Sequence, residues 1–361
     1  MNYCPVCAGA MQELFAMPAM PLCEANDGTT IDQSFLYCEG CSHGRLGTVV
    51  APALLYGKYA ATSKSIGSSV GVANFASFVK SHVKWRHLEC VVDIGGNDGS
   101  LTAQFQVRRR ILVDPNASGE TECIKAFIDE ADLSSLKDAS KLMLCSHTLE
   151  HIAEPEELLR KLQFVMRYDD YAAFQFPSLE LLVQDCRIDQ IYHQHVHYYS
   201  FRSASLILAR YGFQIVAHEF DASHYGALMI VFRKGLGEAM GEAIEPMEIQ
   251  LAHGLFTRSA DALNDRLSIE SGLIGYGASQ MLPLLHYYLP ALSSLEYIVD
   301  EDAAKEGTRY AKPALEVRLY HDMAGKSVVV TAFNTKMAVR AIVKNLIEAN
   351  ARDVIVPFTH L

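Results

Sequence analysis

A short segment near the middle of the chain, residues 189–200, gathers three histidines and three tyrosines in the order DQIYHQHVHYYS. Imidazole titrates near neutral pH and can remove or deliver a proton, and a tyrosine hydroxyl can donate a hydrogen bond to a developing oxyanion. Tyr192 and His195 are the favoured pair for this chemistry, with His193 and Gln194 beside them. This interpretation requires an irregular backbone, because a regular strand would place Tyr192 and His195 on opposite faces.

Two other interpretations of this segment stay open. Residues two apart in a strand share a face, so His193, His195 and His197 could form a set of three metal ligands. The segment could also be a polar surface strand without a chemical role.

A glycine-rich turn is the second segment that could do chemistry, in the run VVDIGGNDGSL at residues 91–101. The pattern predicts a strand, a tight turn and a helix from Ser100, with glycines that let the backbone approach a ligand closely. Asp93 and Asp98 flank the turn, which disfavours a pyrophosphate and suits a cation. S-adenosylmethionine, with its ammonium and sulfonium groups, is such a ligand. The alternative is an ordinary turn. The predicted cofactor contacts here are Asp93, Gly95, Gly96, Asn97, Asp98 and Gly99.

Strands and helices that alternate after this turn predict a parallel sheet with ligands at the carboxyl ends of its strands. Asp114 ends the next strand, where an acidic side chain can hold both ribose hydroxyls, although it also fits an ordinary turn. Ser146 and His147 end a later strand, and we expect them beside the cofactor. Glu150 and His151 follow, and the sequence favours positioning or capping roles for them over acid–base chemistry.

Two Cys-x2-Cys pairs, CPVC at residues 4–7 and CEGC at residues 38–41, lie near the start of the chain. Four thiolates suit a tetrahedral Zn²⁺ ion and leave no open coordination position, which predicts a structural metal site. A set of reduced cysteines without metal is the alternative. The other five cysteines fit buried free thiols better than a disulfide framework. The predicted zinc ligands are Cys4, Cys7, Cys38 and Cys41.

A second glycine-bearing turn, GYGAS at residues 275–279, lies in the last third of the chain. A strand precedes it, and a later strand ends in Asp300, an order similar to that of dinucleotide-binding domains. Backbone amides from Gly277 to Ser279 could hold a phosphate, and a plain tight turn is equally compatible.

The composition limits the partners. The 361 residues are half hydrophobic and carry a net charge of −11, which predicts two or three domains and a sizeable core. Arg108 to Arg110 is the longest basic run, which argues against nucleic acid. The sequence has neither an apolar stretch long enough for a membrane span nor a leader peptide, so we expect no membrane partner and a cytoplasmic protein.

Taken in order, CPVC and CEGC, VVDIGGNDGSL, DQIYHQHVHYYS, SHYGALMIVF and GYGAS resemble the motifs of the sugar C-methyltransferases of deoxysugar biosynthesis. The resemblance covers the whole chain. It implies an enzyme that uses S-adenosylmethionine to methylate a carbon next to the ketone of a nucleotide-linked 4-keto-deoxysugar.

The resemblance also implies the fold and the partners. We expect an α/β protein with a zinc-binding module at residues 1–53, a class I methyltransferase Rossmann-like domain at residues 54–234, and a second Rossmann-like domain at residues 235–361 that frames the substrate. The protein would be a monomer or a small homo-oligomer with a nucleotide-sugar-like substrate. The expected substrate contacts are Tyr59, His197, His224, Gly277 and Ser279.

The family's YHEH motif implies that His195 is the base and that Tyr192 lies in the pocket. Gln194 replaces the family's glutamate and cannot raise the pKa of the neighbouring imidazole with a charge. The family's HGGSLR becomes HYGALM at residues 224–229, without the arginine. Three alternatives therefore stay open: an O-methyltransferase acting on a hydroxyl, a non-catalytic nucleotide-sugar-binding protein, and a metal enzyme that uses the alternating histidines.

Overall fold

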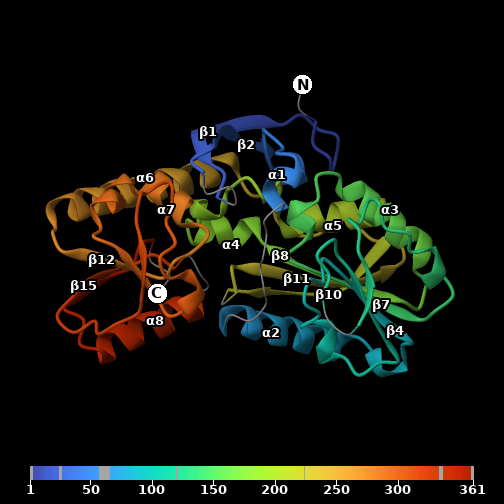
Figure 1. Cartoon of the computed structure of the whole chain (residues 1–361). Helices are drawn as coiled ribbons and strands as arrows, with labels where there is room; N and C mark the ends of the chain where they lie inside the picture. The colour runs from blue at the N-terminus through green and yellow to red at the C-terminus, as the bar shows by residue number, and fades with distance from the viewer. Residues whose placement is uncertain are drawn as a thin grey trace.

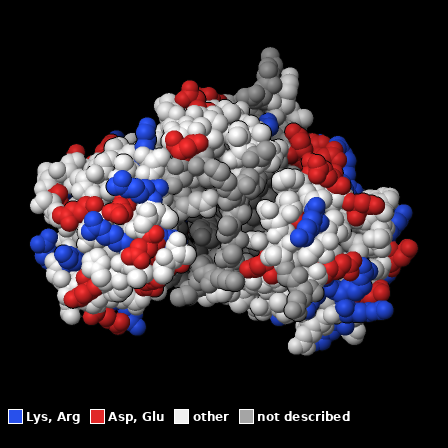
Figure 2. Space-filling view, viewed as in Figure 1, with Lys and Arg blue, Asp and Glu red and all other residues white. Residues whose placement is uncertain are grey.

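Three sheets organise the chain in a computed structural model that describes residues 3–23, 27–56, 66–118, 121–222, 224–332 and 336–358. Two α/β lobes lie side by side, and the N-terminal strands lie above the region between them (Figure 1). The predicted fold class, with a Rossmann-like methyltransferase sheet, a cysteine cluster and a second parallel sheet, is confirmed. In the view of Figure 2, acidic and basic side chains are interspersed over both outer lobes.

The central sheet has seven strands, and its middle strands are buried on both faces as in other parallel sheets covered by helices. In spatial order the strands are β10 (Phe213–Asp221), β11 (Ala227–Lys234), β8 (Tyr171–Pro177), β7 (Lys141–Ser146), β4 (Cys90–Ile94), β5 (Arg109–Val113) and β6 (Glu122–Ile124). Strands β4 to β8 are parallel, and β11 is antiparallel to both β8 and β10. Helices that pack on the two faces include α2 (Ile66–His82), α3 (Pro155–Val165) and α5 (Phe201–Arg210).

The order of these strands places a crevice at the carboxyl ends of β4 and β7, in the middle of the sheet. The chain runs outward from β4 through β5 to β6 and then returns to β7, on the other side of β4. Ligands of doubly wound sheets bind where the strand order reverses in this way, beyond the carboxyl ends of the strands. The glycine turn follows β4, so the fold places it at that point.

The helix predicted from Ser100 is not formed, and that prediction was wrong. One turn of 3₁₀ helix, Thr102–Gln104, is followed by extended chain up to β5. The segment must return along the five-residue strand β4, a length of about 17 Å. A helix over the nine residues between Gly99 and Arg109 would span only about 14 Å and leave no residues for turns.

The C-terminal sheet has five parallel strands, which are β14 (Val317–Leu319), β13 (Ile298–Asp300), β12 (Leu273–Tyr276), β15 (Ser327–Val330) and β16 (Asp353–Ile355) in spatial order. Helices α7 (Leu282–Tyr288) and α8 (Lys336–Glu348) belong to the same lobe. The long helix α6 (Pro246–Ile269) connects the lobes, because Ile249 and Phe256 join the core beneath the N-terminal sheet while Leu267 packs in the C-terminal core.

The N-terminal sheet takes one of its strands from the central part of the chain. Its order is β1 (Gln12–Pro21), β2 (Thr30–Cys38), β3 (His43–Leu46) and β9 (His197–Tyr199), with neighbouring strands antiparallel. Strand β9 is the end of the histidine-rich segment. Short helices α1 (Pro52–Tyr56) and α4 (Leu179–Gln184) complete the structure near this sheet. The N-terminal module therefore holds part of the central domain in place.

None of the helices in the described ranges is long and apolar enough to cross a membrane.

Opposite the crevice, at the start of β7, lies a fully buried ion pair. Lys141 Nζ is 2.7 Å from Asp170 Oδ2 and donates a second hydrogen bond to the Val165 carbonyl, while Asp170 Oδ1 accepts from the Lys141 amide. The pair fixes the end of β7 to the loop before β8.

We expect Lys141→Met to lower the free energy of unfolding by about 3–5 kcal/mol, because Asp170 would become an uncompensated buried charge. Arg160→Met, which removes an exposed arginine paired with Glu156 and Glu157, should cost less than about 1 kcal/mol. Denaturant titration of both variants measures the difference. Equal effects would show that the buried pair has no special structural weight.

Candidate active site

A cavity of about 950 Å³ lies at the crevice where the strand order reverses. Its lining includes the glycine turn after β4, Asp114 after β5, Ser146 to His151 after β7, and part of the histidine-rich segment. The volume is at the upper end of the range for small-molecule sites. Two segments that the sequence singled out separately therefore face one space.

The glycine turn depends on residues that can adopt positive φ. Gly95 and Gly99 both have φ of 75°, and Asn97 has φ of 43°. A Cβ atom at Gly95 would lie 2.0 Å from Thr148 Oγ1, so a larger residue would collide with the turn after β7. The Asn97 amide donates to Asp114 Oδ2 at 3.2 Å, which ties the turn to the end of β5.

Three carboxylates crowd the cofactor end of the cavity. Asp93 is 2% exposed, and burial raises the pKa of its carboxyl to about 7, with further contributions from the charges of Asp114 and Asp98. All three residues line the cavity. Such a site is electrostatically suited to a ligand that carries positive charge.

The end of β7 presents a strained histidine to the same space. His147 has φ of 49°, a region that non-glycine residues rarely adopt, and its amide donates to the Gln175 carbonyl at 2.7 Å. Burial lowers the pKa of its imidazole to about 4. Ser146 beside it donates through Oγ to Gln175 Oε1 at 2.9 Å. Ser146 and His147, which the sequence predicted as cofactor contacts, both line the cavity.

The predicted pair of Tyr192 and His195 is brought together. The backbone there is a turn, not a strand, and the Tyr192 hydroxyl lies 2.9 Å from His195 Nε2. Both side chains line the cavity, as does Gln194. Burial lowers the pKa of the His195 imidazole well below its usual value, so the ring is neutral at physiological pH.

The alternative in which His193, His195 and His197 form a metal set was wrong. His193 donates through Nε2 to the Met20 carbonyl and its Nδ1 faces Gln33 Nε2, at 3.1 and 3.3 Å. His197 donates through Nε2 to the Ala153 carbonyl and its Nδ1 faces His43 Nε2, both at 3.1 Å. The shared face required a regular strand, and only Tyr198 and its two neighbours form one. Neither His193 nor His197 lines the cavity.

Glu150 is a feature whose weight the sequence did not reveal. It is 1% exposed, and Oε1 lies 3.4 Å from His147 Nδ1 and 4.0 Å from His151 Nε2. Burial raises the pKa of the carboxyl to about 7. The only available signal was the spacing SHTLEH at residues 146–151, which does not show which way a side chain points in a turn.

His224 closes the cavity on the side of α2. A Cβ atom at Gly71 would lie 2.4 Å from the His224 ring, so the helix backbone packs directly on the imidazole. Burial lowers the pKa of His224 to about 3, and the nearby His147 contributes. Tyr225 lies beside them in the cavity wall. Tyr59, the other predicted substrate contact of this region, falls outside the described residues.

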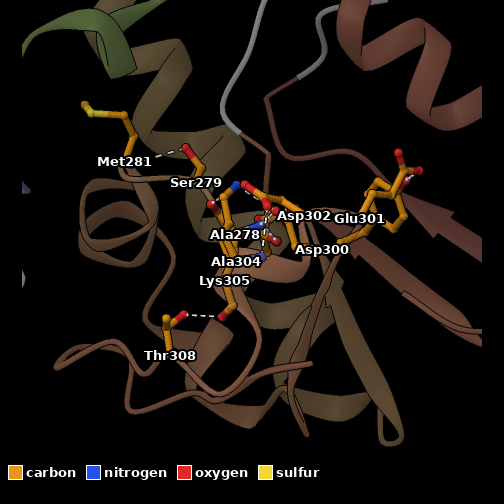
Figure 3. A network of polar contacts seen from close by, with 12 residues as sticks. Ala278, Ser279, Met281, Asp300, Glu301, Asp302, Ala304, Lys305 and Thr308 are labelled. Carbon is orange, nitrogen blue, oxygen red and sulfur yellow. Dashed lines mark hydrogen bonds and ion pairs between the residues drawn. The ribbon is translucent and has the colours of Figure 1, made fainter. Parts of the chain in front are cut away.

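The turn after β12 has its amides engaged within the domain. Gly277 N donates to the Val299 carbonyl, Ala278 N to Asp300 Oδ2 and Ser279 N to the Gly277 carbonyl, at 2.8, 2.7 and 3.1 Å. Asp300 also receives Lys305 Nζ at 3.0 Å (Figure 3). The amides on which the predicted phosphate contact at Gly277 and Ser279 relied are thus occupied, and neither residue lines the cavity.

The four predicted zinc ligands form one cluster. Cys4 Sγ lies 3.5 Å from Cys41 Sγ, and Cys7 Sγ lies 3.4 Å from Cys38 Sγ. All four sulfur atoms are within 4.8 Å of one another, and none forms a disulfide. A hydrogen bond from Cys41 lowers the pKa of Cys4 to about 6, whereas the same hydrogen bond raises the pKa of Cys41 and burial raises that of Cys38. The donor set fits a tetrahedral soft metal ion.

Comparisons with known proteins find similarity to methyltransferases. Residues 72–218 match a family described as a methyltransferase domain. C-methyltransferase NovU of Streptomyces niveus is 22% identical over 223 residues, which cover 58% of this chain and 53% of NovU, so the match spans about half the length of that curated relative.

Solved structures resemble the chain more distantly. The 1,6-didemethyltoxoflavin-N1-methyltransferase of Burkholderia thailandensis is 14% identical, with 56% of this chain and 96% of that chain covered and a TM-score of 0.43. The magnesium protoporphyrin IX methyltransferase of Synechocystis is 12% identical, with 47% and 81% covered and a TM-score of 0.36. The match of residues 72–218 to a methyltransferase domain agrees with the predicted class of enzyme.

Proposed function

We propose that this protein transfers a methyl group from S-adenosylmethionine to a small-molecule acceptor. The observation that carries the proposal is a single cavity lined both by the carboxylates of Asp93, Asp98 and Asp114 and by the Tyr192–His195 pair. The donor would lie across the glycine turn, with its ribose at Asp114 and its cationic groups toward Asp93 and Asp98. The acceptor would lie between the methyl group and His195.

The finer proposal is C-methylation of a nucleotide-linked keto-deoxysugar. The order of the sequence motifs and the similarity to a C-methyltransferase support it. In the simplest route, neutral His195 takes the proton from the carbon next to the ketone through Nε2, and Tyr192 donates to the enolate oxygen. The enolate carbon then attacks the methyl group, and the C–S electron pair stays on the sulfur of S-adenosylhomocysteine. Gln194 and His193 would act by positioning the segment.

O-methylation is a second candidate because Gln194 stands where the resembled family has a glutamate. Incubation with the sugar in deuterated water separates the two reactions. Exchange at the carbon next to the ketone, without methyl transfer, favours C-methylation, whereas a hydroxyl acceptor gives no such exchange.

His195→Ala should reduce methyl transfer to a keto-sugar nucleotide by about 100- to 10,000-fold, because it removes the group that activates the acceptor. S-adenosylmethionine binding, measured by calorimetry, should change little. His87→Ala, on an exposed histidine that does not line the cavity, is the matched control. Unchanged turnover in the His195 variant would exclude this residue from the reaction.

We further propose that Cys4, Cys7, Cys38 and Cys41 bind a structural zinc ion. The cluster and its lack of disulfides support this. Cys38 ends β2 and Cys41 precedes β3, and β3 pairs with β9 directly after the Tyr192–His195 turn. Zinc would thus stabilise the sheet that holds the acceptor end of the cavity.

Cys38→Ser should therefore lose one equivalent of zinc per chain in elemental analysis, with a lower melting temperature and reduced methyl transfer. Cys123→Ser, which changes a half-buried thiol outside the cluster, should keep both zinc content and melting temperature. If zinc content is the same in both variants, the cysteine cluster is not the zinc site.

A further inference from the structure

Glu150 is buried at the acceptor end of the cavity without the hydrogen bonds that a carboxylate normally requires. Neither oxygen accepts one from the part of the chain that the structure describes. The side chain is 1% exposed and lines the cavity. A buried ionised carboxylate is costly unless it is paired or coordinates a cation. The position therefore calls for a positively charged partner.

Three imidazoles lie near this carboxylate, namely His147 with Nδ1 at 3.4 Å, His151 with Nε2 at 4.0 Å, and His195 within 4.8 Å. The last two are oriented as metal ligands are. His151 donates through Nδ1 to the Gln194 carbonyl at 2.8 Å, which turns Nε2 toward Glu150. The imidazole of His195 is held similarly by a hydrogen bond with the backbone of Gln190, and its Nε2 is the atom beside Tyr192. Backbone carbonyls that fix one ring nitrogen are the usual outer-shell partners of metal-bound histidines.

We propose that Glu150, His151 and His195 bind a divalent transition metal ion at the acceptor end of the cavity. One ligand atom from each residue lies within 4.8 Å of those of the other two. Bonds of about 2.1 Å place adjacent ligand atoms roughly 3 Å apart, so modest side-chain rotations would close the set around an ion. Two imidazoles and one carboxylate suit Mn²⁺, Fe²⁺ or Zn²⁺ and leave coordination positions open for a further ligand.

The burial of the three residues separates this set from incidental acidic clusters. Glu150 and His195 are buried and His151 is partly buried, at the wall of a cavity large enough for a ligand. The set also differs from the alternating histidines of the sequence, since His193 and His197 have both ring nitrogens engaged elsewhere. Only the middle histidine of that motif contributes.

The role of the ion in the reaction rests on the proposed function, whereas its binding does not. An ion at this position would bind the carbonyl or hydroxyl oxygen of the acceptor and make the adjacent proton easier to remove. With His195 held as a ligand of the ion, the proton would pass instead to His147, which also lines the cavity and whose Nε2 has no hydrogen-bond partner among the described residues. The Tyr192 hydroxyl would give up its contact with Nε2 and be available to the acceptor.

Mn²⁺ is the probe that separates this site from the cysteine cluster, because thiolates are poor ligands for it. The full chain, with its zinc content verified, is titrated with Mn²⁺ and the bound ion is followed by electron paramagnetic resonance. We expect one Mn²⁺ per chain. Glu150→Gln, of nearly the same shape, should weaken binding by at least about tenfold, as should His151→Asn.

Glu154→Gln is the matched control, because it makes the same chemical change at an exposed residue in the wall of the same cavity. It should bind Mn²⁺ like the unmodified chain. Absence of Mn²⁺ binding, or equal binding in Glu150→Gln and Glu154→Gln, would overturn the site. Circular dichroism of each variant shows that it is folded. A failure of the folded, unmodified chain to bind S-adenosylmethionine in calorimetry would count against the proposed function and leave the metal site standing.

Discussion

Mutual repulsion of three carboxylates at the end of β4 and β5 is the constraint on which the rest of the site depends. Asp93, Asp98 and Asp114 are held close together by a turn that has almost no conformational freedom. Burial and the neighbouring charges raise the pKa of Asp93 to about 7, so its carboxyl is partly protonated near neutral pH and a cationic ligand would favour the ionised form. A sulfonium donor with an ammonium group meets that requirement, and a pyrophosphate does not. The central sheet reverses its strand order at this point, and the reversal leaves a crevice beside the carboxylates in which a ligand can bind.

The opposite end of the cavity depends on a different part of the chain. The Tyr192–His195 turn is followed at once by β9, and β9 is a strand of the N-terminal sheet. The contacts of His193 and His197 with Met20, Gln33 and His43 fasten the same segment to that sheet. A module built around four cysteines thus positions a residue that lies more than 150 positions later in the sequence. His193 and His197 hold the segment on either side of His195. Burial lowers the pKa of both imidazoles, and their hydrogen bonds to the Met20 and Ala153 carbonyls partly offset that shift.

Local pattern predicted much of this arrangement. The cysteine set follows from spacing, and the strand and tight turn at Gly95 follow from the local apolar and glycine pattern, which are properties of neighbouring residues. The prediction of a helix at Ser100 failed because the chain must span the distance back to the start of β5. The local sequence pattern does not contain that distance. The prediction that His193, His195 and His197 share one face of a strand failed, because the segment pairs with β3 only from His197 onward. The position of Glu150 beside the imidazoles of His147 and His151 depends on the turn that follows β7, so it was not visible in the sequence. The amides of Gly277 to Ser279 similarly meet Asp300 and Val299 only once the second sheet is assembled.

The central claim, that a cationic donor binds beside these carboxylates, is tested most directly by calorimetry of S-adenosylmethionine binding between pH 6 and 8. Because the cation favours ionised Asp93, whose pKa is about 7 in the empty site, affinity should rise with pH by up to about tenfold per unit below pH 7 and level off above it. Proton release, measured in two buffers of different ionisation enthalpy, should accompany binding below pH 7, and Asp93→Asn should remove most of the pH dependence. An affinity that is independent of pH in the unmodified protein, or no binding at millimolar donor, would contradict the account.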